Sequence, residues 1–348
     1  MRLTGLIAAA LAVFISGCES QRADGPAGSA GGPREAAAVI GVSVLTFANP
    51  FFHEIAAAVT EEAATHGYSV IVADGENDPL KQDQQVDDFI TKQVDAIILC
   101  PCDSRAVGAS IVKANRAGIP VFTADIASLA DQGEVVCHVA TDNYGGGKAA
   151  GEAVIEAIGG KGKVAVIDFP MVESVIQRTA GVHEVVDKLP EINVAATLPG
   201  GGEKRQSSEA AEDILQTHPD LNAFFCINDP SALGVITAVE KAGKSAQIKI
   251  IGFDAQPEAR RAVAEGRLYA TIVQYPDKIG RTVADAVHKH LTGQEVEAEI
   301  LIPVSIYRKT DADNDPTIIG NPVDNGTRFN GFLRKTGLPL VALVALSS

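Results

Sequence analysis

The stretch that decides the fold is VIGVSVLTFANPFFHEIAAAVTEEAATHGYSVIVAD, residues 39–74. It begins with a nearly continuous apolar run, passes through a short connection, and continues as a helical pattern with Ile55, Val59 and Ala63 on one face. It ends in a second apolar run, "YSVIVAD" (68–74). Apolar runs on either side of an amphipathic helix are typical of parallel strands covered on both faces.

The same alternation continues to about residue 307. Strands are predicted at 38–45, 68–74, 95–100 and 119–125, and then at 134–142, 163–169, 192–198, 223–229, 248–254, 269–274 and 298–307. Helices are predicted over 50–66, 79–93, 104–117, 144–158, 174–188, 205–217, 230–242, 257–265 and 277–291. Two series of similar length predict an α/β protein with two doubly wound, Rossmann-like lobes.

Composition limits the class of protein and its partners. The chain has 348 residues, of which 46% are hydrophobic and 21% charged, as in an ordinary globular protein of about two domains. Its formal net charge of −15 repels phosphate backbones, so we do not expect nucleic acid as a partner.

The first 18 residues are predicted to be a signal peptide. Arg2 gives a positive start, residues 6–15 form an apolar run too short to span a bilayer, and "ISGC" (15–18) resembles the lipobox of bacterial lipoproteins. The resemblance implies cleavage before Cys18 and a lipid on its thiol. The alternative is a simple export signal with an incidental cysteine. Residues 19–38, rich in Gly, Ala and Pro, are predicted to form a flexible tether.

Four further cysteines follow, at positions 100, 102, 137 and 226. Export permits disulfides, but Cys100 and Cys102 are too close for an easy mutual bridge. The "CPC" pair offers two thiolates to zinc, yet no CxxC pair or histidine cluster supports a metal site. We expect Cys100, Cys102, Cys137 and Cys226 to be small apolar residues at strand ends.

Polar residues gather where the predicted strands end. Ligands of open parallel sheets bind beyond the carboxyl ends of the strands, so these residues are candidates for one common cleft. They are Asn49 with Phe51 and Phe52 after the first strand, then Asp125, Asn228 with Asp229, Asp254 and Gln274.

This set fits a polyol. Carboxylates accept from sugar hydroxyls, and amides both donate and accept. Two adjacent rings in a connection are not expected to face one core together, so Phe51 and Phe52 are predicted to pack against the C–H faces of a sugar. The alternative is structural: Asp and Asn at strand ends also cap the next helix, with Asp229 the clearest case, and the Phe pair joins the lobe to its helix.

Several motifs together resemble one family. They are "NPFF" (49–52), "GYSVIVADGENDP" (67–79), "DSRAVG" (103–108), "NRAGIPV" (115–121), "GEVVCHVATDNYGGGKAAG" (133–151), "NDPSALG" (228–234), "AGKSAQIKIIGFDAQPEA" (242–259) and "ATIVQYPDKIG" (270–280). In this order they are similar to ribose-type periplasmic sugar-binding proteins, the type I solute-binding proteins of ABC transporters.

The resemblance implies a type I periplasmic binding protein fold whose lobes close on ligand about three hinge strands, near 141–143, 272–276 and 301–305. The N-terminal lobe would comprise 39–141 and 275–300, and the C-terminal lobe 142–274 and 301–309. The family's sugar contacts fall on Asn49, Phe51, Phe52, Asp125, Asn228, Asp254 and Gln274.

Residues 310–348 break the pattern, with a loop-like start and an apolar run at 338–346 too short to span a membrane. We assign them no role.

Three departures from the ribose pattern bear on specificity. Ile126 stands where the pattern has an arginine, Ile176 stands near the place of a second arginine, and "GGGEKR" (200–205) lacks an expected aromatic. Losing such donors leaves sugar oxygens unpaired, at about 1–3 kcal/mol each. We therefore expect a ligand other than ribose, such as another pentose, a deoxy or methyl sugar, or a cyclitol.

The resemblance implies a non-enzymatic, monomeric receptor without a cofactor, in the periplasm or at the cell surface, that delivers a sugar to an ABC permease. A sensory receptor for a sugar, nucleoside, cyclitol or autoinducer is the alternative.

An enzyme is not favoured, because the glycine runs at 145–147 and 159–162 do not complete a phosphate loop and more simply permit a tight turn. His288 and His290, two apart on a predicted helix, point in different directions. A sugar-sensing repressor would need a DNA-binding segment where the export signal stands.

Overall fold

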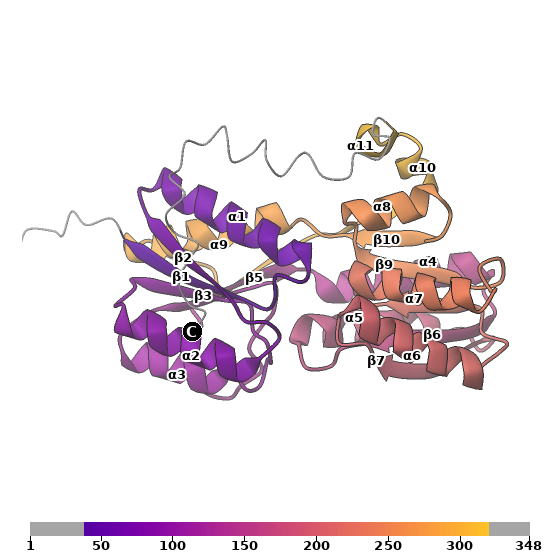
Figure 1. Ribbon diagram of the computed structural model, residues 1–348. Helices are drawn as coiled ribbons and strands as arrows, with labels where there is room; N and C mark the ends of the chain where they lie inside the picture. Colours follow the sequence, from indigo (N-terminus) through magenta and orange to yellow (C-terminus); the bar gives the residue numbers. More distant parts are fainter. Residues whose placement is uncertain (1–37, 320–348) are drawn as a thin grey trace, which may run out of the picture. The chain divides into compact units, whose positions relative to one another are not determined.

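The computed structural model describes residues 38–319, and it confirms two α/β lobes, each built on a six-stranded sheet (Figure 1). The predicted signal peptide, Cys18, almost all of the tether and the apolar run at 338–346 lie outside the described residues.

The first sheet has the order β11-β5-β4-β3-β1-β2, and all its strand pairs are parallel. The strands are β1 (Val39–Val44), β2 (Ser69–Asp74), β3 (Ala96–Leu99), β4 (Val121–Ala124), β5 (Cys137–Thr141) and β11 (Glu299–Ile302). Side chains alternate between two apolar cores: Ile98 of β3 belongs to the core under α1, and Ile97 to the core under α2 and α3.

The second sheet has the order β12-β10-β9-β8-β6-β7 and is parallel except for β12, which runs antiparallel to β10. Its strands are β6 (Gly162–Asp168), β7 (Ile192–Pro199), β8 (Ala223–Cys226), β9 (Lys249–Asp254), β10 (Ala270–Val273) and β12 (Ser305–Arg308). Phe225 and Phe224 of β8 face opposite cores, so this sheet is also buried on both sides.

Helices cover both faces of each sheet (Figure 1). On the first sheet, α1 (Pro50–Thr65) packs against α9 (Pro276–Leu291), and α2 (Pro79–Thr91) against α3 (Gly108–Arg116). On the second, α4 (Asn143–Ile158) packs against α5 (Glu173–Val186), and α6 (Lys204–Thr217) against α7 (Asp229–Lys241), with α8 (Pro257–Ala264) beside β10. None of the helices described between residues 38 and 319 is both long and apolar enough to cross a membrane.

The chain passes between the lobes three times: from β5 to α4 at Asp142, from β10 to α9 at 274–275, and from β11 to β12 at 303–304. The prediction of one strand over 298–307 is wrong, because β11 and β12 lie in different sheets. Pro303, which has no N–H to donate to a ladder, separates them.

The glycine run at 145–147 lies inside helix α4, so its interpretation as a tight turn is wrong. A Cβ on Gly147 would stand 2.1 Å from the carbonyl oxygen of Arg178, and one on Gly181 would stand 2.3 Å from that of Tyr144. The glycines thus let α4 and α5 approach closely, which brings the backbone of Arg178 against α4.

The prediction that the residues after β12 are loop-like is wrong in part. They include the short helices α10 (Lys309–Ala312) and α11 (Pro316–Ile319). Between them, Asp315 accepts a 2.9 Å hydrogen bond from the hydroxyl of Tyr307. This contact holds the start of the tail against β12.

The interpretation of the internal cysteines is confirmed. Cys100, Cys102, Cys137 and Cys226 are buried in the apolar cores, and none of them is bonded to another cysteine of residues 38–319. Burial raises the pKa of the Cys102 thiol to about 12 and that of Cys137 to about 11, which keeps both thiols neutral and unreactive.

Candidate functional site

A cavity lies beyond the carboxyl ends of the strands and is lined by residues of both lobes. The empty space among its lining residues, including the part open to solvent, is about 450 Å³. All seven residues predicted for the ligand site line it: Asn49, Phe51, Phe52, Asp125, Asn228, Asp254 and Gln274.

Asn49 both caps helix α1 and joins the two lobes. Its Oδ1 accepts a 3.0 Å hydrogen bond from the backbone N–H of Phe51, as an N-cap residue does. The same oxygen accepts a 2.5 Å bond from Nε2 of Gln256, which follows β9 in the other lobe. Asn49 is therefore both a helix cap and a residue of the cavity wall.

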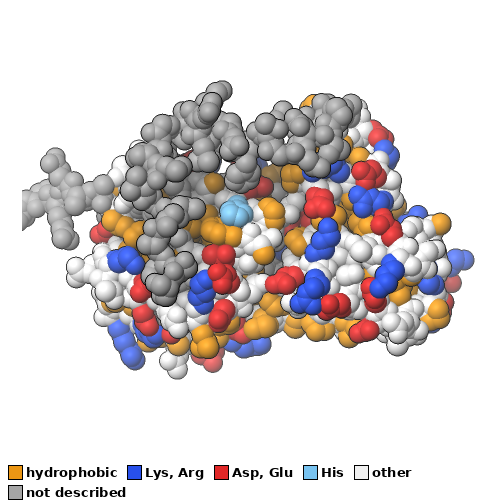
Figure 2. All heavy atoms as spheres, in the orientation of Figure 1, with side chains coloured by type: hydrophobic (Ala, Val, Ile, Leu, Met, Phe, Trp, Pro, Cys, Tyr) orange, Lys and Arg blue, Asp and Glu red, His pale blue; other side chains and the backbone are white. Residues whose placement is uncertain are grey.

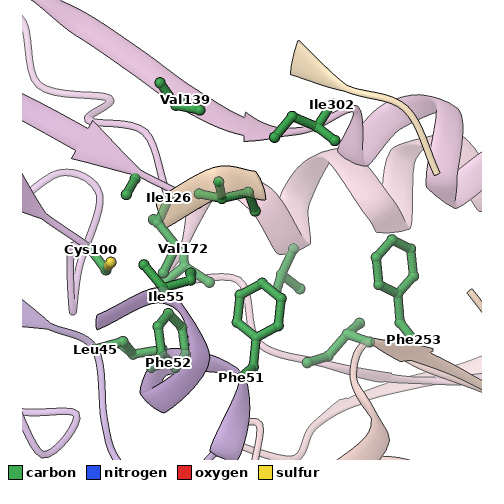
Figure 3. Close-up of a cluster of buried hydrophobic side chains, with 14 of the residues drawn as sticks. Leu45, Phe51, Phe52, Ile55, Cys100, Ile126, Val139, Val172, Phe253 and Ile302 are labelled. Carbon is green, nitrogen blue, oxygen red and sulfur yellow. The ribbon is translucent and has the colours of Figure 1, made fainter. Parts of the chain in front are cut away.

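Phe51 and Phe52 occupy the first turn of α1, where they are 2% and 3% exposed. Their rings meet edge to face, with centroids 5.3 Å apart. Figure 3 shows them among Leu45, Ile126 and Val172. The expectation that adjacent rings do not share one core is wrong, because both belong to the same apolar cluster while also lining the cavity.

Asp125 follows β4 directly, with its backbone in the left-handed region at φ 65°. It is 3% exposed, and its Oδ1 has no hydrogen-bond partner among the described residues. Burial raises the pKa of this carboxyl to about 6, against the lowering effect of the nearby Arg178 charge. A strained, buried and unpartnered acceptor is typical of a ligand site.

Asp254 ends β9 and has the same character, with φ at 120° and 5% exposure. Its Oδ1 accepts a 2.7 Å bond from Nε2 of Gln274, while its Oδ2 has no partner among residues 38–319. Burial raises the pKa of Asp254 to about 7, and the Asp125 charge contributes in the same direction. Gln274 in turn accepts a 2.6 Å bond from the hydroxyl of Thr141, which fixes the amide at a lobe crossing.

Asn228, not Asp229, caps helix α7. Its Oδ1 accepts from the backbone N–H of Ser231 at 2.9 Å, and its Nδ2 donates to the carbonyl of Gly202 at 3.0 Å. The expectation that Asp229 is a cap is wrong. This fully buried carboxylate accepts instead from the hydroxyl of Thr271 and the backbone N–H of Gln256, at 2.7 Å each.

Sequence reasoning missed Asn77, which lines the cavity from the connection after β2. Its φ is 57°, and its Oδ1 is buried without a partner in the described part of the chain. Its Nδ2 donates a 3.1 Å bond to Oε1 of Glu203 in the other lobe. The available signal was its place three residues after a strand end, in "GENDP" (75–79).

We expected a site without the arginines of the ribose pattern, but Arg178 of α5 lines the cavity and is 4% exposed. Its Nε donates to Oδ1 of Asn143 at 2.8 Å, one of its terminal nitrogens donates to the carbonyl of Ile227 at 2.9 Å, and its guanidinium lies 4.0 Å from the ring centroid of Phe253. Arg178 is thus anchored by the protein itself. The available signal was the second arginine that the ribose pattern places near Ile176, two residues before Arg178.

The predicted absence of a ring at 200–205 holds, since Gly201 and Gly202 line the cavity there. The second lobe supplies a ring from another place, however, because Phe169 lines the cavity directly after β6. Phe169 directly follows the end of a strand, as the predicted site residues do, so the same feature of the sequence could have identified it.

Hydrogen bonds between the lobes surround the cavity. Besides the bonds from Gln256 to Asn49 and from Asn77 to Glu203, the backbone N–H of Ser104 donates to the carbonyl of Met171 at 3.0 Å. The hydroxyl of Ser104 accepts from the backbone N–H of Glu173 at 2.8 Å. The lobes therefore meet on more than one side of the cavity.

The molecular surface is mixed in charge. Figure 2 shows basic and acidic side chains interspersed on the face that it draws, without a continuous basic strip among the described residues. Such a surface does not favour a polyanionic partner on this face.

Comparison with known proteins shows the family to which this architecture belongs. Residues 40–295 match the family model described as a periplasmic binding protein domain. The chain is 35% identical to the ribose import binding protein RbsB of Escherichia coli (strain K12), over 78% of this chain and 90% of that protein. It is 34% identical to the ribose import binding protein RbsB of Bacillus subtilis (strain 168), over 77% and 86% respectively. Among solved structures, an ABC transporter solute binding protein from Agrobacterium vitis, bound with alpha-D-tagatopyranose, matches with a TM-score of 0.77 and 28% identity, covering 81% of this chain and 98% of that one.

Proposed function

Because the chain belongs to the periplasmic binding protein family, as the motifs in its sequence predicted, we propose that it binds a monosaccharide or related polyol between its lobes and delivers it to an ABC permease. Its relatives are binding proteins rather than enzymes, which supports a role without catalysis. The relatives named for ribose import and the structure bound to a tagatopyranose support the sugar class.

The observation that carries this proposal is a set of three acceptors on one cavity that lack partners among the described residues: Asn77 Oδ1, Asp125 Oδ1 and Asp254 Oδ2. A buried acceptor without a partner costs about 1–3 kcal/mol, and more when it is charged. Sugar hydroxyls would supply the missing donors. All three residues have positive φ, a strain that is typical of functional sites.

The rings of Phe51, Phe52 and Phe169 supply the apolar part of the site. The C–H faces of a sugar would pack against them while its hydroxyls reach the acceptors. Ile126, 1% exposed and directly after Asp125, adds a branched apolar wall. This wall supports a guest other than ribose, such as another pentose or a deoxy sugar.

The three lobe crossings support closure about a hinge. The bonds between the lobes would then hold the closed, ligand-bound form that a permease recognises. A lipid on Cys18 would keep the protein at the membrane, as the motif at 15–18 predicts.

Thermal unfolding against a panel of pentoses, hexoses, deoxy sugars and cyclitols tests the proposal. A ligand at 100 times its Kd adds about 2.7 kcal/mol. That gain would raise Tm by several degrees at roughly 2–4 °C per kcal/mol. If no sugar or polyol raised Tm, the sugar assignment would be wrong, and nucleosides and autoinducers would be the next panel.

A further inference from the structure

Asp229 is a buried carboxylate beside the cavity that the proposed sugar contacts leave without a role. It directly follows the cavity residue Asn228, but it does not itself line the cavity, and it does not cap α7. Its side chain is fully buried. A buried carboxylate is costly to the fold unless its oxygens are hydrogen-bonded, so its bonding partners indicate what it is kept for.

Both carboxylate oxygens of Asp229 accept hydrogen bonds from neighbouring segments of the second sheet. Oδ1 accepts from the hydroxyl of Thr271 in β10, and Oδ2 accepts from the backbone N–H of Gln256, two residues after β9, at 2.7 Å each. The hydroxyl oxygen of Thr271 accepts in turn from the backbone N–H of Ala255 at 3.2 Å. Asp229, which follows β8, therefore ties the turn after β9 to β10.

Strand β9 leaves space for this carboxylate to reach β10. Gly252 of β9 pairs with Thr271 of β10. A Cβ on Gly252 would stand 2.5 Å from Oδ1 of Asp229 and 3.4 Å from the hydroxyl oxygen of Thr271. The first distance is too short for any side chain, so the bond between Asp229 and Thr271 requires glycine at position 252.

The turn that Asp229 holds has a strained backbone. Asp254 and Ala255 have φ angles of 120° and 56°, which residues other than glycine rarely adopt. Such a conformation persists only where the surrounding structure imposes it. The bonds donated by the backbone N–H groups of Ala255 and Gln256, to Thr271 and to Asp229, are the contacts that impose it here.

Two side chains of the turn face different parts of the proposed site. Asp254 lines the cavity, and its Oδ2 has no partner among the described residues. Gln256 reaches the opposite lobe, where its Nε2 donates to Oδ1 of Asn49 at 2.5 Å. The conformation of the turn therefore determines both where the Asp254 carboxyl lies and whether Gln256 can bond to the other lobe.

We propose that Asp229 is a positioning residue, which holds the turn at 254–256 so that Asp254 meets the sugar and Gln256 meets the opposite lobe. This inference rests on the proposed sugar-binding function, and it adds a residue that acts through others without touching the guest. Loss of this arrangement should weaken binding while the sheet remains folded.

Asp229→Asn and Thr271→Val test the inference, because each keeps the shape of the side chain. An asparagine cannot accept with both of its terminal atoms, and a valine neither donates to Asp229 nor accepts from Ala255. The full chain is titrated calorimetrically with ribose and with tagatose. For whichever sugar binds the natural protein, Asp229→Asn is expected to raise Kd at least tenfold and Thr271→Val at least threefold.

The double variant tests whether the two residues act as one unit. Its Kd is expected to lie within twofold of that of Asp229→Asn alone, because the second substitution acts on an arrangement that is already broken. Ser110→Ala is the control, since it removes a 2.7 Å bond from a buried hydroxyl to Asp83 in the other lobe and should leave Kd unchanged. Single effects that multiplied in the double variant would overturn the inference.

Amide hydrogen exchange of the ligand-free chain tests the turn without a sugar. In Asp229→Asn the amides of Ala255 and Gln256 are expected to exchange at least tenfold faster, while those of α6 in the same lobe keep their natural rates. Unchanged exchange at the turn, equal acceleration in α6, or an unchanged Kd would overturn the inference. Failure of both sugars to bind the natural protein would count against the proposed function alone, because the exchange rates would still decide the role of Asp229.

Discussion

Asn77 and Glu203, which are 126 positions apart in the chain, are joined by a hydrogen bond of 3.1 Å from Nδ2 of the amide to Oε1 of the carboxylate. The same residue lines the cavity, and its Oδ1 has no partner among residues 38–319. One side chain therefore belongs to the cavity and bonds to the opposite lobe through its nitrogen, so a ligand in the proposed site would be coupled to the contact between the lobes.

Removing the partner of Asn77 should weaken ligand binding without unfolding the protein. Glu203→Ala deletes one bond between the lobes, worth about 0.5–1.5 kcal/mol net, so a two- to tenfold rise in Kd is expected for any sugar that the panel identifies. Glu209→Ala on α6, the helix that Glu203 precedes, is the control, because Glu209 is exposed and pairs with its neighbour Arg205. Equal affinities in the two variants would mean that the contact does not support the closed form.

Asp254 should make the ligand-free protein less stable as the pH rises. Burial raises its pKa to about 7 in the folded protein, from about 3.9 when unfolded. Between these values the folded state holds a proton that the unfolded state has lost, so the free energy of unfolding falls from about pH 4 to about pH 7 and then levels. Asp125, with its pKa raised to about 6, acts in the same direction over a narrower range.

The measurement is Tm against pH for the natural protein and for Asp254→Asn. Each pKa unit corresponds to about 1.4 kcal/mol, so the difference between the two proteins should grow by a few kcal/mol between pH 4 and pH 7. A constant difference across this range would contradict the raised pKa.

Phe52 should contribute to stability and to binding, and two substitutions separate these roles. Because Phe52 is only 3% exposed, Phe52→Ala should cost about 3–5 kcal/mol of unfolding free energy. Phe52→Leu keeps most of the apolar volume but loses the flat ring, so it should weaken sugar binding about tenfold with a smaller fall in Tm.

Phe89→Leu is the matched control for Phe52→Leu, because Phe89 is 2% exposed in the separate core under α2 and α3. It should lower Tm without changing the Kd. If both leucine variants changed the Kd equally, the ring of Phe52 would have no specific role at the ligand.

Arg178 should stabilise the fold by lying near two buried carboxylates. Arg178→Met leaves Asp125 and Asp254 without this cation and the buried oxygens of Asn143 and Ile227 without their donor, so it should cost about 1–3 kcal/mol for each group left unpaired, measured by urea unfolding. Adding Asp254→Asn removes one of the charges left behind, so the double variant should be more stable than the sum of the single effects predicts. Strict additivity would show that the charges do not interact.

Cys18 should determine where the protein is found in the cell. Cys18→Ser removes the thiol that would carry the lipid, so the protein is expected to leave the membrane fraction for the soluble extracytoplasmic fraction. Immunoblots of the two fractions measure this, with Cys102→Ser as the control because its thiol is buried. A Cys18→Ser protein that still pelleted with membranes would argue against the anchor.

Several features could be predicted from the sequence because they depend on neighbouring residues. The burial of β1 and β3 follows from their apolar runs, and the start of α1 follows from Asn49 and Pro50, which cap and initiate a helix locally. Parallel strands place their carboxyl ends at one edge of the sheet. The polar residues at these strand ends, Asp125 and Asp254 among them, could therefore be assigned to the cavity without any contact being known.

Other features were decided only by tertiary structure. Arg178 lies in the site because Gly147 lets α5 approach α4, and no local pattern encodes that approach. The strand predicted at 298–307 divides because its two halves pair with β5 and β10, partners more than 30 residues away in different sheets. Whether an oxygen of Asp125 or Asp254 lacks a partner depends on every group packed around it. Periodicity and capping act over a few residues, whereas burial, charge balance and unsatisfied hydrogen bonds are properties of segments that meet only in the folded chain.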